Sequence, residues 1–168
     1  MWTAEMKEQT EKSSFEGLSL AEIQEINAEM SHYEDKTAVS IEALKIVQKR
    51  RRWVSDECLV AVAGLLDISP TQLEGVATFY NLIYRQPVGK TVIHYCNSVT
   101  CWMLGSDQVR ERLCRHLNVE LGEMSENGEY TILPIVCLGA CDHAPVVMVG
   151  DELMLDITEN AVNEILGN

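Results

Sequence analysis

Residues 91–117 read TVIHYCNSVTCWMLGSDQVRERLCRHL, and the fold class follows from this stretch. Thr91–Tyr95 is rich in β-branched and aromatic residues, which predicts a strand that runs directly into Cys96. Residues 102–117 are predicted to form an amphipathic helix, whose apolar face consists of Val109, Leu113 and Leu117. The local order is therefore strand, loop, helix.

The chain after this stretch is predicted to add three strands and a last helix. The turn pairs Asn127-Gly128 and Gly150-Asp151 separate apolar, β-branched segments. The predicted strands are Tyr130–Val136, Val146–Val149 and Leu153–Ile157, and the helix covers 158–166. This order of elements is typical of a small α/β or α+β sheet domain of thioredoxin type.

The chain before this stretch is predicted to be wholly helical. Apolar periodicity and the capping residues Ser55 and Ser69 indicate four helices, over 18–33, 39–52, 55–66 and from 69 onward. The basic run Lys49–Arg52 is interpreted as a solvated helix end. Pro87 and Gly89 mark the boundary between the two halves. We therefore expect an α+β protein with a flexible N-terminus (1–17), a helical docking domain (18–86) and a thioredoxin-like domain (87–168).

Composition excludes several classes of function. With 26 acidic and 13 basic residues, the formal charge of −13 opposes binding to nucleic acid or to anionic lipid. The longest apolar run is far shorter than the ~20 residues that span a bilayer, so no transmembrane segment is expected. The N-terminus resembles neither a secretory signal nor a transit peptide, so we expect a reducing cytosol and free thiols.

Four of the six cysteines form two pairs in the predicted sheet domain. Cys96 and Cys101 are separated by four residues, Cys137 and Cys141 by three, and each pair follows a predicted strand. Neighbouring strand ends lie at one edge of a sheet, so the two loops are expected to converge and bring four thiolates together. Thiolates select iron–sulfur clusters, zinc or copper(I).

Spacing favours a [2Fe–2S] cluster on Cys96, Cys101, Cys137 and Cys141. The bacterial four-iron and plant-type ferredoxin patterns need a Cys-x2-Cys interval, which the chain lacks. A Rieske centre needs two histidines in cluster loops, but only Cys141-x-His143 is placed in a loop, since Cys114-x-His116 lies inside a predicted helix. Structural zinc is the alternative, although most zinc sites use tighter cysteine knuckles. Colour separates the two hypotheses, because zinc thiolates are colourless.

Several residues outside the four paired cysteines also have a predicted role, either at the cluster or in the structure. Gly139 is the expected hinge of the second loop, able to aim an amide N–H at a cluster sulfur. His143 either tunes the cluster or is an exposed loop histidine. Cys58 and Cys114 lie in helices beside apolar residues and are interpreted as small core residues. No dinucleotide-binding glycine fingerprint is present, so nothing indicates that the chain itself binds NADH.

Three motifs resemble those of a known family. They are EGVATFY at 74–80, the Cys96-x4-Cys101 loop followed by Met103-x-Gly105, and Cys137-Leu-Gly-Ala-Cys141-x3-Pro-Val-Val. Over nearly all of 18–168 the chain resembles the NuoE-type subunit, the thioredoxin-like ferredoxin of bacterial respiratory complex I. The resemblance implies a helical domain before a thioredoxin-like domain, and makes the same four cysteines the cluster ligands.

The resemblance also implies partners and a function. It makes the chain an electron-transfer subunit of NADH:quinone oxidoreductase, with no catalytic activity alone. FMN and NADH are expected on a NuoF-type partner in a heterodimer, within a complex on the cytoplasmic side of the inner membrane. The same module serves NAD-dependent formate dehydrogenases and NAD-linked hydrogenases, so the host complex stays open. A free-standing ferredoxin is disfavoured because about 85 helical residues exceed what a cluster loop needs.

Overall fold

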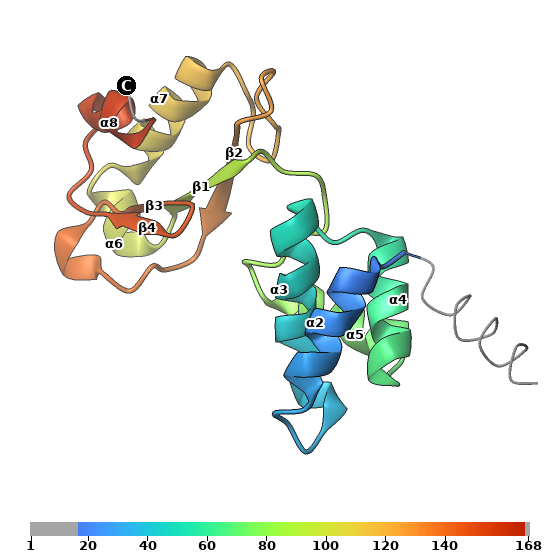
Figure 1. Ribbon diagram of the computed structural model, residues 1–168. Helices are drawn as coiled ribbons and strands as arrows, with labels where there is room; N and C mark the ends of the chain where they lie inside the picture. The colour runs from blue at the N-terminus through green and yellow to red at the C-terminus, as the bar shows by residue number, and fades with distance from the viewer. Residues whose placement is uncertain (1–16, 167–168) are drawn as a thin grey trace, which may run out of the picture. The chain divides into compact units, whose positions relative to one another are not determined.

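The computed structural model describes residues 17–166, which divide into two compact units, one ending at Pro87 and the other beginning at Val88 (Figure 1). The N-terminal segment predicted to be flexible lies, apart from Gly17, outside the described residues. The predicted class is confirmed, since helices come first and a sheet with further helices follows. Among the described residues no helix is both long and apolar enough to cross a bilayer.

The first unit is built from helices, as predicted. Ser19, Ser55 and Ser69 cap three of them through side-chain oxygens that accept backbone N–H groups. Its core is aliphatic and includes the fully buried Leu44, Leu66 and Leu73. The elements are α2 (Leu20–Met30), the 3-10 turn η1 (Lys36–Val39), α3 (Ser40–Arg51), α4 (Asp56–Leu66) and α5 (Pro70–Phe79).

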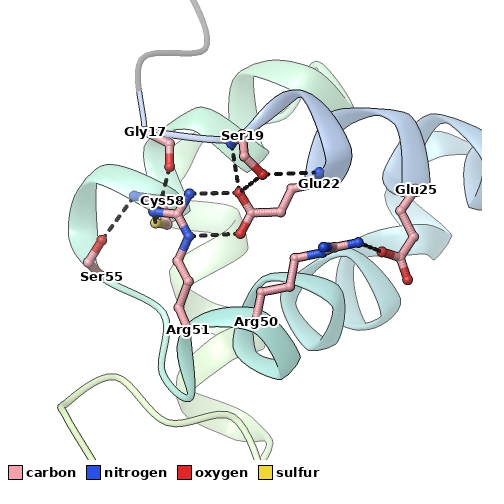
Figure 2. A network of polar contacts seen from close by, with 8 residues as sticks. All are labelled: Gly17, Ser19, Glu22, Glu25, Arg50, Arg51, Ser55 and Cys58. Carbon is pink, nitrogen blue, oxygen red and sulfur yellow. Dashed lines mark hydrogen bonds and ion pairs between the residues drawn. The ribbon is translucent and has the colours of Figure 1, made fainter.

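The end of α3 corrects one expectation, because Arg51 is not simply solvated. Its Nε and Nη2 donate to the two carboxylate oxygens of Glu22 on α2, at 2.7 and 2.6 Å. Its Nη1 lies 3.0 Å from the Sγ of Cys58 on α4, and Figure 2 shows the guanidinium between these two side chains. Glu22 is buried and also accepts from the backbone and hydroxyl of Ser19. Sequence periodicity carries no information on a partner 29 residues away.

The second unit contains a four-stranded mixed sheet with strand order β2-β1-β3-β4. β1 runs parallel to β2 and antiparallel to β3, and β3 pairs with β4 as a hairpin. Helix α7 packs on β1 and β2, and α8 packs on α7. Their shared core includes Ile93, Leu113 and Ile132. The elements are β1 (Thr91–Cys96), α6 (Val99–Met103), α7 (Ser106–Leu117), β2 (Tyr130–Ile135), η2 (Cys141–His143), β3 (Val147–Val149), β4 (Glu152–Met154), η3 (Glu159–Ala161) and α8 (Val162–Ile165).

In the second unit, three differences from the sequence-based expectation are larger than a shift of one residue at the end of an element. The single helix expected over 102–117 is two helices, because Gly105 has φ +106°, a left-handed conformation that ends α6 and begins α7. The last strand ends at Met154 rather than Ile157, and Asp156 with φ +52° turns the chain away from the sheet. The last helix begins as a 3-10 turn and becomes α-helical at Val162. Each difference is a local backbone turn, which apolar periodicity does not report.

Gly89 is required where the chain enters the sheet unit. Its N–H donates to the Oγ1 of the buried Thr131 at 2.9 Å, and a Cβ would lie 2.6–2.8 Å from backbone atoms of Tyr130. Backbone atoms of a sheet cannot move aside as a flexible side chain can. We expect Gly89→Ala to lower the free energy of unfolding by about 3 kcal/mol, measured by urea unfolding of the purified chain.

The matched control is Gly75→Ala in α5, where a Cβ meets nothing within 4 Å. Alanine has the higher helix propensity, so this variant should be more stable than the wild-type chain by about 0.5–1 kcal/mol. If Gly89→Ala unfolds at the wild-type urea concentration, the close approach to Tyr130 does not constrain position 89.

Candidate metal centre

The two cysteine loops begin at the same edge of the sheet. Cys96 is the last residue of β1, and its register partner on the parallel strand β2 is Ile135, two residues before Cys137. The N–H of Asn97 donates to the Ile135 carbonyl at 3.0 Å, which holds the first loop against the end of β2. The N–H of Cys96 donates to Val146 at 3.1 Å. Parallel pairing therefore places the two loops side by side.

The two cysteine pairs differ in exposure. Cys96 and Cys101 are each 1% exposed and form a small buried cluster with Val146. Cys101 lies within α6, which begins three residues after β1. Cys137 and Cys141 are exposed, with their Sγ atoms 3.7 Å apart. One pair is thus buried in the protein and the other faces outward.

The four thiols interact electrostatically with one another. Burial raises the pKa of the Cys101 thiol to about 11, and the Cys96 thiol and the charges of Cys96 and Cys141 act in the same direction. The pKa of Cys141 is also raised, first by its hydrogen bond with Cys137 and also by the charge of Cys96. Thiolates this close repel each other unless a cation neutralises them. A bound iron would supply that charge and displace the protons.

The thiol arrangement suits a two-iron cluster better than a single ion. Structural zinc needs four ligands around one ion, whereas a four-cysteine [2Fe–2S] cluster takes two thiolates at each of two irons. Two separate pairs with charges that interact fit the second requirement.

One backbone donor points at a candidate ligand sulfur, and two other groups lower the pKa of a paired cysteine. Gly139 has φ +86°, as its expected hinge role requires, and its N–H lies 3.4 Å from the Sγ of Cys137. A hydrogen bond from the Val146 backbone lowers the pKa of Cys101, and one from the Thr100 side chain lowers the pKa of Cys141, each against larger effects that raise it. Sequence reasoning found Gly139 but missed the other two. The position of Thr100 directly before the candidate ligand Cys101 could have indicated it. A main-chain N–H such as that of Val146 cannot be predicted from the type of its residue.

The remaining candidate residues lie outside this constellation. His143 is half exposed, and its Nδ1 lies 3.0 Å from a carboxylate oxygen of Asp156, which raises the pKa of the imidazole. It lies in η2, and its exposure agrees with one of its two sequence-based interpretations. Cys58 is buried, as expected of a core residue, and Cys114 is half-buried against the core of the sheet unit. Neither lies among the four paired cysteines.

Apolar side chains are exposed beside the cysteine pairs. Residues 91–106 and 130–141 contain no Asp, Glu, Lys or Arg, in a chain of net charge −13. The exposed side chains in these segments include Val99, Trp102, Met103, Leu104 and Val136, which we call the apolar rim. Trp102 is 59% and Met103 73% exposed. Depletion of charge together with exposed Trp and Met is typical of the centre of a protein–protein interface.

Comparison with known proteins agrees with this geometry. The profile of the thioredoxin-like [2Fe-2S] ferredoxin family matches residues 26–168, which include all four paired cysteines. The chain belongs to this family. The predicted fold and the predicted [2Fe–2S] cofactor are thereby confirmed, and the zinc alternative is set aside.

Curated relatives match nearly the whole chain. The NADH-quinone oxidoreductase subunit designated E in Escherichia coli (strain K12) is 46% identical over 159 residues, covering 95% of each chain. The protein of the same name from Pseudomonas aeruginosa is 44% identical over 149 residues, covering 89% of this chain and 90% of the relative. The recognised resemblance to the complex I ferredoxin subunit is confirmed by these relatives.

A solved structure shares the fold at low sequence identity. The NAD+-reducing [NiFe]-hydrogenase in the air-oxidized state matches with a TM-score of 0.64 and 17% identity. The match covers 77% of this chain and 22% of the hydrogenase chain. At this identity the likeness concerns the fold alone.

Proposed function

We propose that this chain is the electron-transfer subunit of an NADH:quinone oxidoreductase and holds one [2Fe–2S] cluster on Cys96, Cys101, Cys137 and Cys141. The observation that carries the proposal is the convergence of the two cysteine pairs at one sheet edge. Whole-length relatives that are named as a subunit of that enzyme support the choice of host complex.

A bound [2Fe–2S] cluster supplies reversible one-electron chemistry. The chain's own contribution is to hold four thiols deprotonated around it and to stabilise their negative charge. Two ferric ions, two sulfides and four thiolates sum to about −2, and one more electron makes the sum about −3. The N–H of Gly139 and the other donors at the sulfurs therefore matter most in the reduced state.

The two cysteine pairs differ in burial, and we infer that the buried pair anchors the cluster while the exposed pair faces the redox partner. Cys96 and Cys101 are anchored in β1 and α6 with little access for water. Cys137 and Cys141 lie open on the loop after β2, where a docked protein would come closest to the site. The path from the cluster to a protein docked on that side would be short, which suits single-electron exchange.

The partner we propose is the FMN- and NADH-binding subunit of the same complex, of NuoF type. The apolar rim supports it, because an uncharged exposed surface beside the site would be covered in such an assembly. The chain would then be a peripheral subunit on the cytoplasmic side of the membrane, carried there by its complex and without catalytic activity of its own.

The second candidate host is an NAD-linked hydrogenase or formate dehydrogenase. A NAD+-reducing [NiFe]-hydrogenase contains a part with the same fold, which is compatible with this alternative. The relatives that cover the chain at 44–46% identity favour the quinone oxidoreductase. The cluster and the proposed flavin partner are the same in both hosts, so the choice affects only the larger assembly.

Electron paramagnetic resonance of the dithionite-reduced chain tests the proposal, with iron and acid-labile sulfide assayed on the same sample. We expect a rhombic signal below the free-electron g value and equal iron and sulfide, near two of each per chain. A silent sample that lacks sulfide would overturn the electron-transfer function. Affinity purification of the tagged chain from its native cells should recover a flavoprotein, and the other recovered subunits identify the host.

A further inference from the structure

A cleft of about 360 Å³ opens in the second unit, beside the segments that carry the paired cysteines. One wall is the junction of α6 and α7, which begins three residues after Cys101, and the other wall consists of residues that follow η2 and β4. Leu104 belongs both to the apolar rim and to this cleft, so the cleft continues the surface that we propose for the flavoprotein partner. The lining includes Leu104, Gln108, Pro145, Asp156, Ile157 and Thr158.

Main-chain hydrogen bonds join the two segments of the second wall. The N–H of Asp156 donates to the His143 carbonyl at 2.8 Å. The N–H of Ile157 donates to the Pro145 carbonyl at 2.9 Å. The wall is therefore formed before a partner docks, and a preformed site binds at a lower entropic cost than one that must be ordered on binding.

The lining combines apolar walls with acceptor groups and one negative charge. Asp156 is the one charged side chain among the described residues that line the cleft. One of its carboxylate oxygens lies 3.0 Å from the Nδ1 of His143, and the other takes no part in that contact. The amide of Gln108 and the hydroxyl of Thr158 add further acceptors. A side chain with a long apolar stem and a cationic head has the complementary chemistry.

The charge of the second unit also favours a cationic occupant. From residue 88 onward the sequence has 12 acidic residues and only 4 basic ones, and none of the described basic side chains lines the cleft. A docking partner gains from positive charge at its contact surface. Arginine fits better than lysine, because its planar guanidinium can donate to a carboxylate and to a second acceptor at once, and because arginine is enriched at interfaces whereas lysine is depleted.

We propose that the cleft receives an arginine side chain of the FMN- and NADH-binding subunit, with the guanidinium bound to Asp156 and the stem against the apolar walls. This inference rests on the proposed function, since it names the same partner subunit. It deepens that function by assigning a charged anchor to a surface that is otherwise apolar. The anchor would fix the orientation of the docked subunit next to the cysteine loops.

Asp156→Asn removes the charge and keeps the shape, and asparagine tolerates the left-handed conformation of this position, φ +52°. The probe is the flavoprotein subunit that is recovered with the tagged chain and then separated from it. We expect its dissociation constant for the full, cluster-loaded chain to rise about 10- to 100-fold at low salt, because the guanidinium loses its charged partner. The control is Glu120→Gln, beyond the far end of α7 from the cleft, which should bind like the wild-type chain.

Gln108→Glu is a second variant, and it should act in the opposite direction. A second carboxylate in the cleft attracts a guanidinium, so the dissociation constant should fall about three- to tenfold at low salt. A merely structural role of the two positions would weaken binding in both variants. If Asp156→Asn does not fold, Gln108→Glu decides alone: tighter binding supports the arginine anchor, and unchanged or weaker binding overturns it.

The measurement is calorimetric titration of the chain with the flavoprotein at low and at high salt. Equal affinity of Asp156→Asn and the wild-type chain overturns the anchor and leaves the proposed function standing. A wild-type chain that does not bind the flavoprotein overturns the proposed partner itself. Weaker binding of Asp156→Asn with the wild-type salt dependence would indicate an uncharged occupant, and self-association of the wild-type chain that Asp156→Asn abolishes would indicate a second copy of this chain. Either of these last results overturns the arginine anchor.

Discussion

Cys101→Ser is expected to remove the cluster, so that the variant contains less than a tenth of the wild-type iron and sulfide and gives no paramagnetic signal on reduction. Serine can ligate iron only as an alkoxide, and its hydroxyl is far harder to deprotonate than a thiol. At position 101 the environment makes this worse, because burial already raises the pKa of the native thiol to about 11. A buried hydroxyl next to Cys96 would stay protonated and leave one iron without its fourth ligand.

The control variant is Cys114→Ser in α7. Cys114 is half-buried against the core of the sheet unit and is not one of the four paired cysteines, so its substitution costs some packing but no ligand. We expect wild-type iron and sulfide contents in Cys114→Ser. Full cluster content in Cys101→Ser would remove Cys101 from the ligand set, and loss of the cluster in both variants would mean that domain stability, not ligation, was measured.

The proximity of the two cysteine pairs could be predicted from sequence because it follows from the topology of the sheet. A residue directly after a strand lies at the sheet edge, and two such residues on adjacent parallel strands lie near one another. Cys96 and Cys137 satisfy that rule through the register of β1 with β2. Gly139 could be selected because a left-handed backbone conformation strongly favours glycine.

The features that could not be predicted from sequence depend on the backbone conformation or on contacts between distant residues, which do not affect the apolar periodicity. The break at Gly105 was hidden because apolar residues continue at helical spacing on both sides of it. Arg51 was misinterpreted for a related reason: a basic residue at a helix C-terminus is favourable by itself, so the sequence pattern required no partner.

Arg51→Met is expected to lower the free energy of unfolding by about 3–5 kcal/mol at neutral pH. The substitution leaves the carboxylate of Glu22, 1% exposed, without the guanidinium that binds both of its oxygens. Only the hydrogen bonds from the backbone and hydroxyl of Ser19 remain. α2 should therefore detach first, and urea unfolding followed by circular dichroism measures the loss.

Arg50→Met is the matched control, one residue earlier on the same helix (Figure 2). Arg50 pairs with Glu25 at 2.6 Å, but the two side chains are 44% and 41% exposed. Water solvates both charges when an exposed pair is broken, so the cost should stay below about 1 kcal/mol. Equal effects of the two substitutions would show that burial of Glu22 does not distinguish the pairs.

The pH dependence separates loss of the ion pair from loss of packing. Burial opposes ionisation of Glu22, but the hydrogen bonds from Arg51 and Ser19 outweigh it and lower the pKa from 4.5 to about 2. Because the pKa is lower in the folded state, the wild-type chain has this stabilisation, about 3 kcal/mol, above pH ~4.5 and loses it as the pH falls toward ~2. In Arg51→Met, burial without the guanidinium raises the pKa of Glu22. Protonation of its carboxylate at acid pH then removes the free-energy cost of a buried charge. The difference in stability between the two proteins should therefore be largest near pH 7 and shrink below pH ~4, whereas a pure packing defect would keep the same size at every pH.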